Sequence, residues 1–78
     1  MSREEVEELA EGAILLNGFD ECIVGVVEEF GNGIRIIYSR DKILENLKEE
    51  MTEEEANEFY YYNIVGGYFG ERNPLFLV

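Results

Sequence analysis

The 78-residue sequence predicts a single α+β domain over residues 1–78, with its elements in the order α-β-β-α-α-β. Three observations support this: a hairpin pattern lies in the first half, capped helical patterns flank it, and a short apolar segment ends the chain. The strands are expected to form a three-stranded, mostly antiparallel sheet packed against the helices. With 46% hydrophobic and 13% aromatic residues, the chain has enough apolar surface for a compact core despite its charge.

The first helix is predicted over about residues 3–11. Ser2 and Glu5 have the spacing of a capping box, and apolar residues then recur at helical intervals. Gly12 is a natural stop, although the apolar segment 13–16 leaves a longer helix open.

The hairpin is predicted from two β-branched segments, 22–27 and 34–38, joined by the Gly-Asn-Gly turn at 31–33. Segment 22–27 is apolar on both faces, which is typical of a strand that is central in its sheet or covered from both sides. The single cysteine, Cys22, has no partner for an internal disulfide and is expected to be a buried thiol.

Two further helices are predicted after the hairpin. Ser39 is the expected cap of a helix over about residues 40–50. Thr52 and Glu55 form a second capping box, with Met51 placed for a hydrophobic staple, so a third helix begins at about residue 53.

The end of the third helix is predicted at Gly66 and Gly67. A phosphate-binding loop would have its glycines before a helix, whereas here they follow one, so a helix stop is the better interpretation. The amide of Asn63 is expected to bond to the backbone of turn 66–70, a structural role rather than a ligand contact. Segment 75–78 then forms a short strand that has to dock.

The charge balance restricts the partners. Six basic and eighteen acidic residues give a formal charge of −12, which argues against direct binding of nucleic acid or of an anionic membrane. The acidic beginning is unlike a signal peptide, and no apolar run approaches the ~20 residues of a membrane span. We expect a cytoplasmic protein.

Catalysis has little support in the sequence. There is no histidine, and Ser2, Ser39 and Thr52 all have capping explanations. No loop has the alternating oxygen ligands of a calcium site. We therefore expect no catalytic residue, no metal and no cofactor, and a protein that is not an enzyme.

Candidate contact residues lie on the helices. Tyr61 and Tyr62 follow the buried stripe of the third helix and point to its flank or to solvent, although half-burial under a loop stays open. The candidate acidic contacts are Glu4, Glu8, Glu45 and Glu49. Two interpretations of the acidic helices also stay open, a surface that mimics the phosphates of DNA and a set of solvated faces that maintain solubility.

Five motifs are spread over most of the chain, about residues 18–77: GFDECIVG at 18–25, YSRDKI at 38–43, MTEEEA at 51–56, NIVGGYFGE at 63–71 and PLF at 74–76. In these motifs the chain resembles a family of small proteins encoded by bacteriophages and prophages. The resemblance implies expression in an infected cell and binding of a host factor. Gly67 departs from the pattern, where a small residue such as alanine is expected.

Three functional hypotheses follow. The leading one is a non-enzymatic protein that binds a host protein, as an inhibitor of a nucleic-acid-binding or defence system. The first alternative is a structural or self-associating module, in which segment 75–78 extends a sheet across a homodimer. The second is a small-molecule-binding or sequestering protein, with the ligand between the glycine turn and the hairpin.

Overall fold

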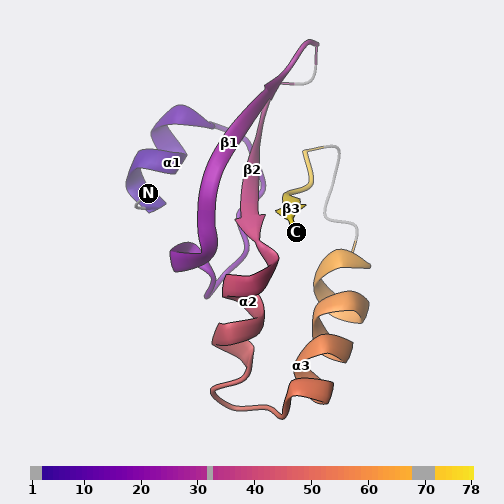
Figure 1. The fold of residues 1–78 in the computed structure, drawn as a ribbon. Helices are drawn as coiled ribbons and strands as arrows, with labels where there is room; N and C mark the ends of the chain where they lie inside the picture. Colours follow the sequence, from indigo (N-terminus) through magenta and orange to yellow (C-terminus); the bar gives the residue numbers. More distant parts are fainter. Residues whose placement is uncertain (1–2, 32, 68–71) are drawn as a thin grey trace.

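The computed structural model describes residues 3–31, 33–67 and 72–78 of the chain, which form an α+β domain (Figure 1). The predicted order of elements is confirmed, with a three-residue 3-10 helix and a π-helical segment in addition. The elements are α1 (Arg3–Leu9), the 3-10 helix η1 (Asp20–Cys22), β1 (Ile23–Glu29), β2 (Gly33–Ser39), α2 (Arg40–Leu47), α3 (Glu53–Phe59), the π-helical η2 (Tyr60–Val65) and β3 (Leu75–Leu77).

The hairpin is confirmed, with β1 and β2 paired antiparallel. Gly31 and Gly33 have φ of 81° and 77°, a left-handed conformation that glycine adopts without strain, whereas Asn32 lies outside the described residues. The sheet order is β1-β2-β3. Of the two alternatives left open for segment 22–27, the central place in the sheet is not adopted, because β1 is an edge strand.

The chain end docks on the other side of β2 as β3, in parallel. The sheet is thus mixed, with the antiparallel hairpin as its longer pairing. Two arginines tie the segment before β3 to the start of β2. Arg35 donates from Nε to the carbonyl of Asn73 at 2.7 Å, and Arg72 donates from Nη2 to the carbonyl of Ile34 at 2.7 Å.

The helices begin and end close to the predicted positions. The hydroxyl of Ser39 accepts a hydrogen bond from the N–H of Lys42, so this cap of α2 is confirmed. Helix α1 is two residues shorter than predicted, and Gly12 follows it at a φ of 82°. The longer alternative through 13–16 is not adopted, because those residues leave the helix and Leu16 enters the core. Ser2 lies outside the described residues.

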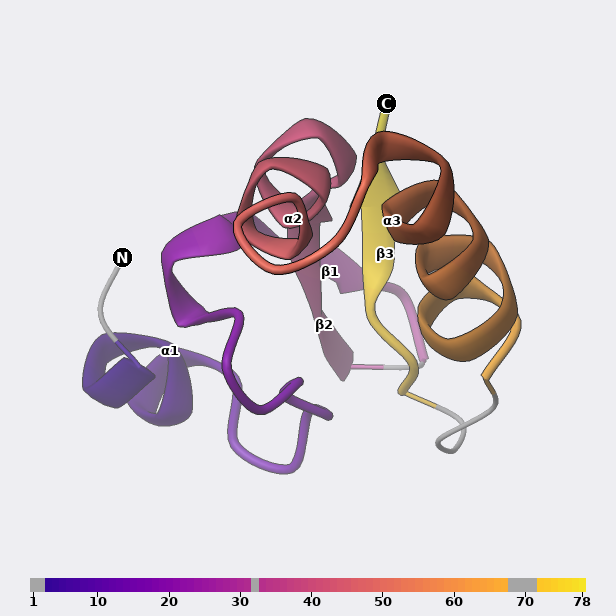
Figure 2. The same cartoon turned by 90° about the horizontal axis from the view of Figure 1, so that it is seen from below.

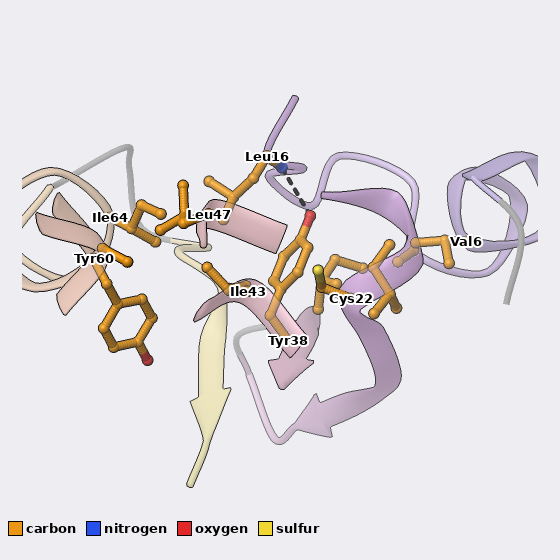
Figure 3. Close-up of a cluster of buried hydrophobic side chains, with 12 residues drawn as sticks. Val6, Leu16, Cys22, Tyr38, Ile43, Leu47, Tyr60 and Ile64 are labelled. Atoms are coloured by element: carbon orange, nitrogen blue, oxygen red, sulfur yellow. Dashed lines mark hydrogen bonds between the residues drawn. The ribbon is translucent and has the colours of Figure 1, made fainter. Parts of the chain in front are cut away.

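Tyr38 lies at the centre of an elongated core (Figure 3). It is fully buried, its hydroxyl accepts a hydrogen bond from the backbone N–H of Leu16 at 2.8 Å, and its ring lies 6.3 Å from that of Phe76. Helices α1 and α3 lie at opposite ends of the molecule in the view along the strands (Figure 2), and both contribute to this one core, through Val6 and through Ala56. The buried members of the core are Val6, Ala10, Leu16, Cys22, Ile23, Ile36, Tyr38, Ile43, Leu47, Ala56, Tyr60 and Ile64.

Candidate functional site

The helix that carries the two candidate tyrosines starts at a capping box. The hydroxyl of Thr52 accepts from the N–H of Glu55 at 3.2 Å, and the Glu55 carboxylate accepts from the N–H of Thr52 at 3.1 Å. These bonds lower the pKa of Glu55 and confirm the predicted start. Met51 packs against the core, and the staple predicted for it stays a prediction.

The last turn of this helix is wider than an α-helix. The N–H of Gly66 donates to the carbonyl of Tyr61 at 2.9 Å, a bond that spans five residues and defines the π-helical η2. A Cβ atom at Gly66 would lie 2.8 Å from that same oxygen, closer than real Cβ atoms come to their neighbours. Gly66 therefore ends the helix by allowing close backbone approach, and its φ of −74° is not left-handed.

The three consecutive tyrosines of the π turn differ in their exposure to solvent. Tyr60 is buried and its ring lies 5.8 Å from that of Phe76, whereas Tyr61 is 51% exposed and Tyr62 is 81% exposed. The ring of Tyr61 meets that of Tyr60 edge-on at 5.0 Å, which holds it against the body of the protein. Half-burial under a loop, the alternative to exposure, is therefore excluded for Tyr62.

Tyr61 and Tyr62 belong to one exposed surface, which we call the α3–η2 face and define as Glu55, Glu58, Tyr61, Tyr62 and Val65. All five are exposed, and Val65 adds an apolar side chain that is 42% exposed. A hollow of 330 Å³ lies on this part of the surface, lined by Glu55, Glu58, Phe59, Tyr62 and Asn63. The face therefore combines two large aromatic side chains with carboxylates.

The α3–η2 face has no positive charge within its own stretch of chain. The sequence contains no lysine or arginine between Lys48 and Arg72. Among the cations elsewhere, Arg35 pairs with Glu29 at 2.7 Å, and Arg72 donates to backbone carbonyls. The carboxylates Glu55 and Glu58 of this face can therefore attract a positively charged partner.

The predicted contacts Glu45 and Glu49 lie on α2 and in the turn after it, away from the tyrosines. They line a hollow of 420 Å³ between η1 and α2, together with Glu21 and Asp41, which sequence reasoning did not single out. The four-residue spacing of Asp41, Glu45 and Glu49 is the signal that places them on one stripe. Glu45 also pairs with Lys48 at 3.7 Å.

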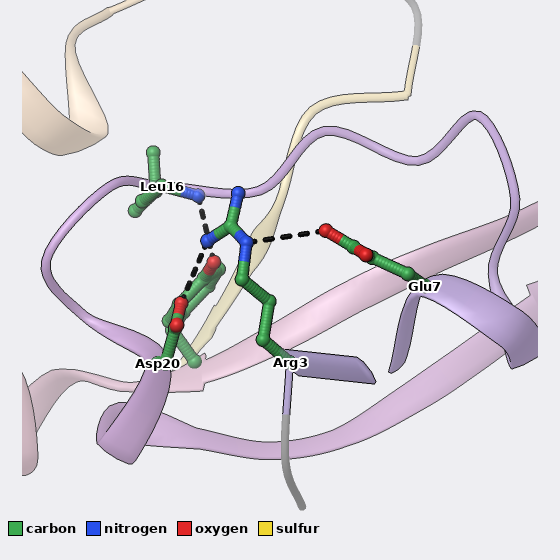
Figure 4. A network of polar contacts seen from close by, with 5 residues as sticks. Arg3, Glu7, Leu16 and Asp20 are labelled. Atoms are coloured by element: carbon green, nitrogen blue, oxygen red, sulfur yellow. Dashed lines mark hydrogen bonds and ion pairs between the residues drawn. The ribbon is translucent and has the colours of Figure 1, made fainter. Parts of the chain in front are cut away.

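The predicted contacts Glu4 and Glu8 are exposed on a third element, α1. Beside them Arg3 joins the helix to η1, with Nη1 2.8 Å from the Asp20 carboxylate and Nε 3.2 Å from that of Glu7 (Figure 4). The fold therefore places the candidate residues on separate elements and does not gather them into one site.

Asn63, Gly66 and Gly67 are the residues predicted to shape the end of the third helix. Gly66 does so by allowing the close approach of its backbone to the Tyr61 carbonyl. The Asn63 side chain is exposed, and no hydrogen bond joins it to the described part of the chain. Part of turn 66–70 lies outside the described residues, so the bond predicted for Asn63 and the turn predicted at Gly67 stay predictions.

Reactive and metal-binding groups are few in the described structure. Cys22 is 2% exposed at the end of η1, and burial raises the pKa of its thiol, which favours the unreactive form. Within residues 3–31, 33–67 and 72–78, no three metal-binding side chains come together. In the same ranges, no helix is long and apolar enough to cross a bilayer.

Comparison with known proteins gives no relative. The chain matches no family model, no curated protein and no solved structure.

Proposed function

We propose that this chain is a non-enzymatic protein that binds a basic surface of another protein through the α3–η2 face. The observation that carries the proposal is the exposure of Tyr61 and Tyr62 among carboxylates with no lysine or arginine in the same stretch of chain. Neither the arrangement of this face nor the described surroundings of Cys22 calls for a catalytic step.

Tyrosine suits the role of an anchor. It offers a large, stiff contact area with a polar tip, and it is enriched among the residues that dominate binding energy at interfaces. The edge-on contact with Tyr60 fixes the ring of Tyr61 before binding, so little conformational freedom is lost on association. Tyr62, at 81% exposure, has more surface to bury than Tyr61, at 51%.

The carboxylates select the chemistry of the partner. Glu55 and Glu58 flank the tyrosines in a chain of net charge −12, so a surface rich in lysine and arginine would be attracted over a Debye length, about 8 Å at physiological salt. Proteins that bind nucleic acid carry such surfaces. This supports the host-protein hypothesis. The resemblance to phage-encoded proteins implies a partner in the cytoplasm of an infected cell.

The test is capture from a host lysate, followed by titration with the purified captured protein. We expect Tyr61→Ala combined with Tyr62→Ala to weaken binding by at least ~30-fold, since an anchor contributes about 2 kcal/mol or more. We expect Glu55→Gln combined with Glu58→Gln to slow association at low salt and to have less effect at about 0.5 M salt.

A matched control lies on α1. Leu9 is 55% exposed, similar to Tyr61, but belongs to another element, so Leu9→Ala should leave the affinity unchanged. The proposal fails if the double tyrosine variant binds as tightly as the parent protein. It also fails if the captured protein binds through an acidic surface of its own.

A further inference from the structure

The register of the sheet assigns its side chains to two faces. Directly paired residues point to the same face, so the pairs Val27 with Arg35, Gly25 with Ile37, and Ile37 with Leu75 share one side. Leu77, two residues beyond Leu75, falls on that side as well. We call this the reverse face and define it by Gly25, Val27, Ile37, Leu75 and Leu77.

The core uses only the opposite face. Ile36 and Tyr38 are buried members of the core, and Val26 and Phe76 pack against it. Of the described residues, none that belongs to the reverse face is in the core or packs against it. A Cβ atom built at Gly25 meets nothing within 4 Å, so the space above this position is open.

The composition of the reverse face does not suit exposure to water. A sheet with one solvated face normally alternates apolar residues inside with polar residues outside. Here the outer positions are held by Val27, Ile37, Leu75 and Leu77, and Leu77 is 60% exposed. Strand β1 is apolar on both sides, as the sequence shows, but the described residues cover it on one side only.

The charge of the reverse face is balanced internally. Arg35 lies on this side by register, and its Nη1 is 2.7 Å from the carboxylate of Glu29. The face is therefore neutral and apolar in a protein of net charge −12. Such a face does not fit the basic partner proposed for the α3–η2 face, and it is a place where two copies can meet without bringing unpaired carboxylates together.

We propose that the reverse face is an isologous interface between two copies of this chain. A two-fold contact needs a self-complementary patch, and this one offers apolar side chains together with one cation and one anion. Two such sheets packing face to face interdigitate their side chains at a spacing of about 10 Å. Burial of the second face also gives a small domain a larger apolar core than one copy holds.

The test is sedimentation equilibrium of the full chain over a hundredfold concentration range, with the variants Gly25→Lys and Leu77→Lys. We expect the parent protein to reach twice its 9.0 kDa mass, and both variants to stay monomeric over that range. Gly25→Lys projects into open space in one copy, and Leu77 is exposed, so both variants should fold, which circular dichroism and urea unfolding check.

The matched control is Val65→Lys, which adds the same charge at a 42% exposed site on η2 and should leave dimerisation intact. Each lysine lowers the net negative charge, so the change in overall charge would favour association in every variant. The loss of the dimer that we expect for Gly25→Lys and Leu77→Lys is the opposite effect. Raising salt from about 0.02 to 0.5 M should strengthen the dimer by screening the repulsion between copies.

Other outcomes would overturn the interface. A parent protein that is monomeric at every concentration and salt would do so. Dimers that persist in Gly25→Lys would point instead to pairing along the free edge of β3, because position 25 lies on β1 at the far side of the sheet. Loss of the dimer in Val65→Lys would assign the contact to the α3–η2 face.

Discussion

Replacing Tyr38 by phenylalanine removes one oxygen atom from the centre of the core. That oxygen accepts the backbone N–H of Leu16 at 2.8 Å, in a place where Tyr38 is 0% exposed and Leu16 is 8% exposed. The phenylalanine ring retains the contact with Phe76 at 6.3 Å, so the change isolates the hydrogen bond. What remains is a buried donor without an acceptor.

The expected loss of stability follows from the unsatisfied backbone N–H of Leu16. An unsatisfied buried polar group costs about 1 to 3 kcal/mol, so we expect the free energy of unfolding to fall by roughly 2 kcal/mol. In a domain of this size each kcal/mol corresponds to about 4 to 8 °C in Tm, which gives a decrease of about 8 to 16 °C. Urea unfolding followed by circular dichroism, together with a thermal scan, measures both quantities.

Tyr61→Phe is the matched control, because its hydroxyl belongs to a side chain that is 51% exposed and the change should stay within about 0.5 kcal/mol. If Tyr38→Phe also stays within about 0.5 kcal/mol of the parent protein, the Leu16 N–H has another partner in the native state. The hydrogen bond would then not hold segment 13–16 to the sheet.

Two other measurements test the core and the helix exit. Burial raises the pKa of Tyr38, with the Leu16 N–H acting in the opposite direction, and burial also raises that of Tyr60. The native state thus holds these two protons more tightly than the unfolded chain. The contribution of the two tyrosines to stability should therefore be fully present below about pH 10 and be lost above it, so stability should fall less steeply above pH 10 in Tyr38→Phe; equal slopes in urea titrations would contradict this. Gly66→Ala should destabilise the protein by roughly 1 to 3 kcal/mol, because its Cβ would lie 2.8 Å from the Tyr61 carbonyl oxygen, and an unchanged unfolding curve would rule out the π turn.

Local signals in the sequence were sufficient for most of the fold. The capping residues Ser39 and Thr52 make bonds to backbone groups three positions away, and such bonds depend on neighbouring residues alone. The Gly-Asn-Gly turn fixes the hairpin for the same reason. Helical spacing also turned Tyr62 away from the buried stripe, at 100° per residue, but it left exposure and half-burial under a loop as alternatives.

Other features depended on contacts between distant segments. The place of β1 at the sheet edge required β3 to pair with β2, and that pairing joins residues almost forty positions apart through Arg35 and Arg72. The hollow that unites Glu21 with Glu45 likewise requires η1 to lie against α2. Neither arrangement corresponds to a periodic pattern of residues in the sequence.

The sequence by itself determined the element types, the acidic character and the apolar composition of both sides of β1, because these depend on local spacing and residue chemistry. Only the tertiary structure decided which of those sides the described residues cover, and that Tyr62 is exposed rather than half-buried under a loop. The physical reason is that a strand's pattern records how many of its faces are apolar, whereas the partner of each face is set by long-range packing.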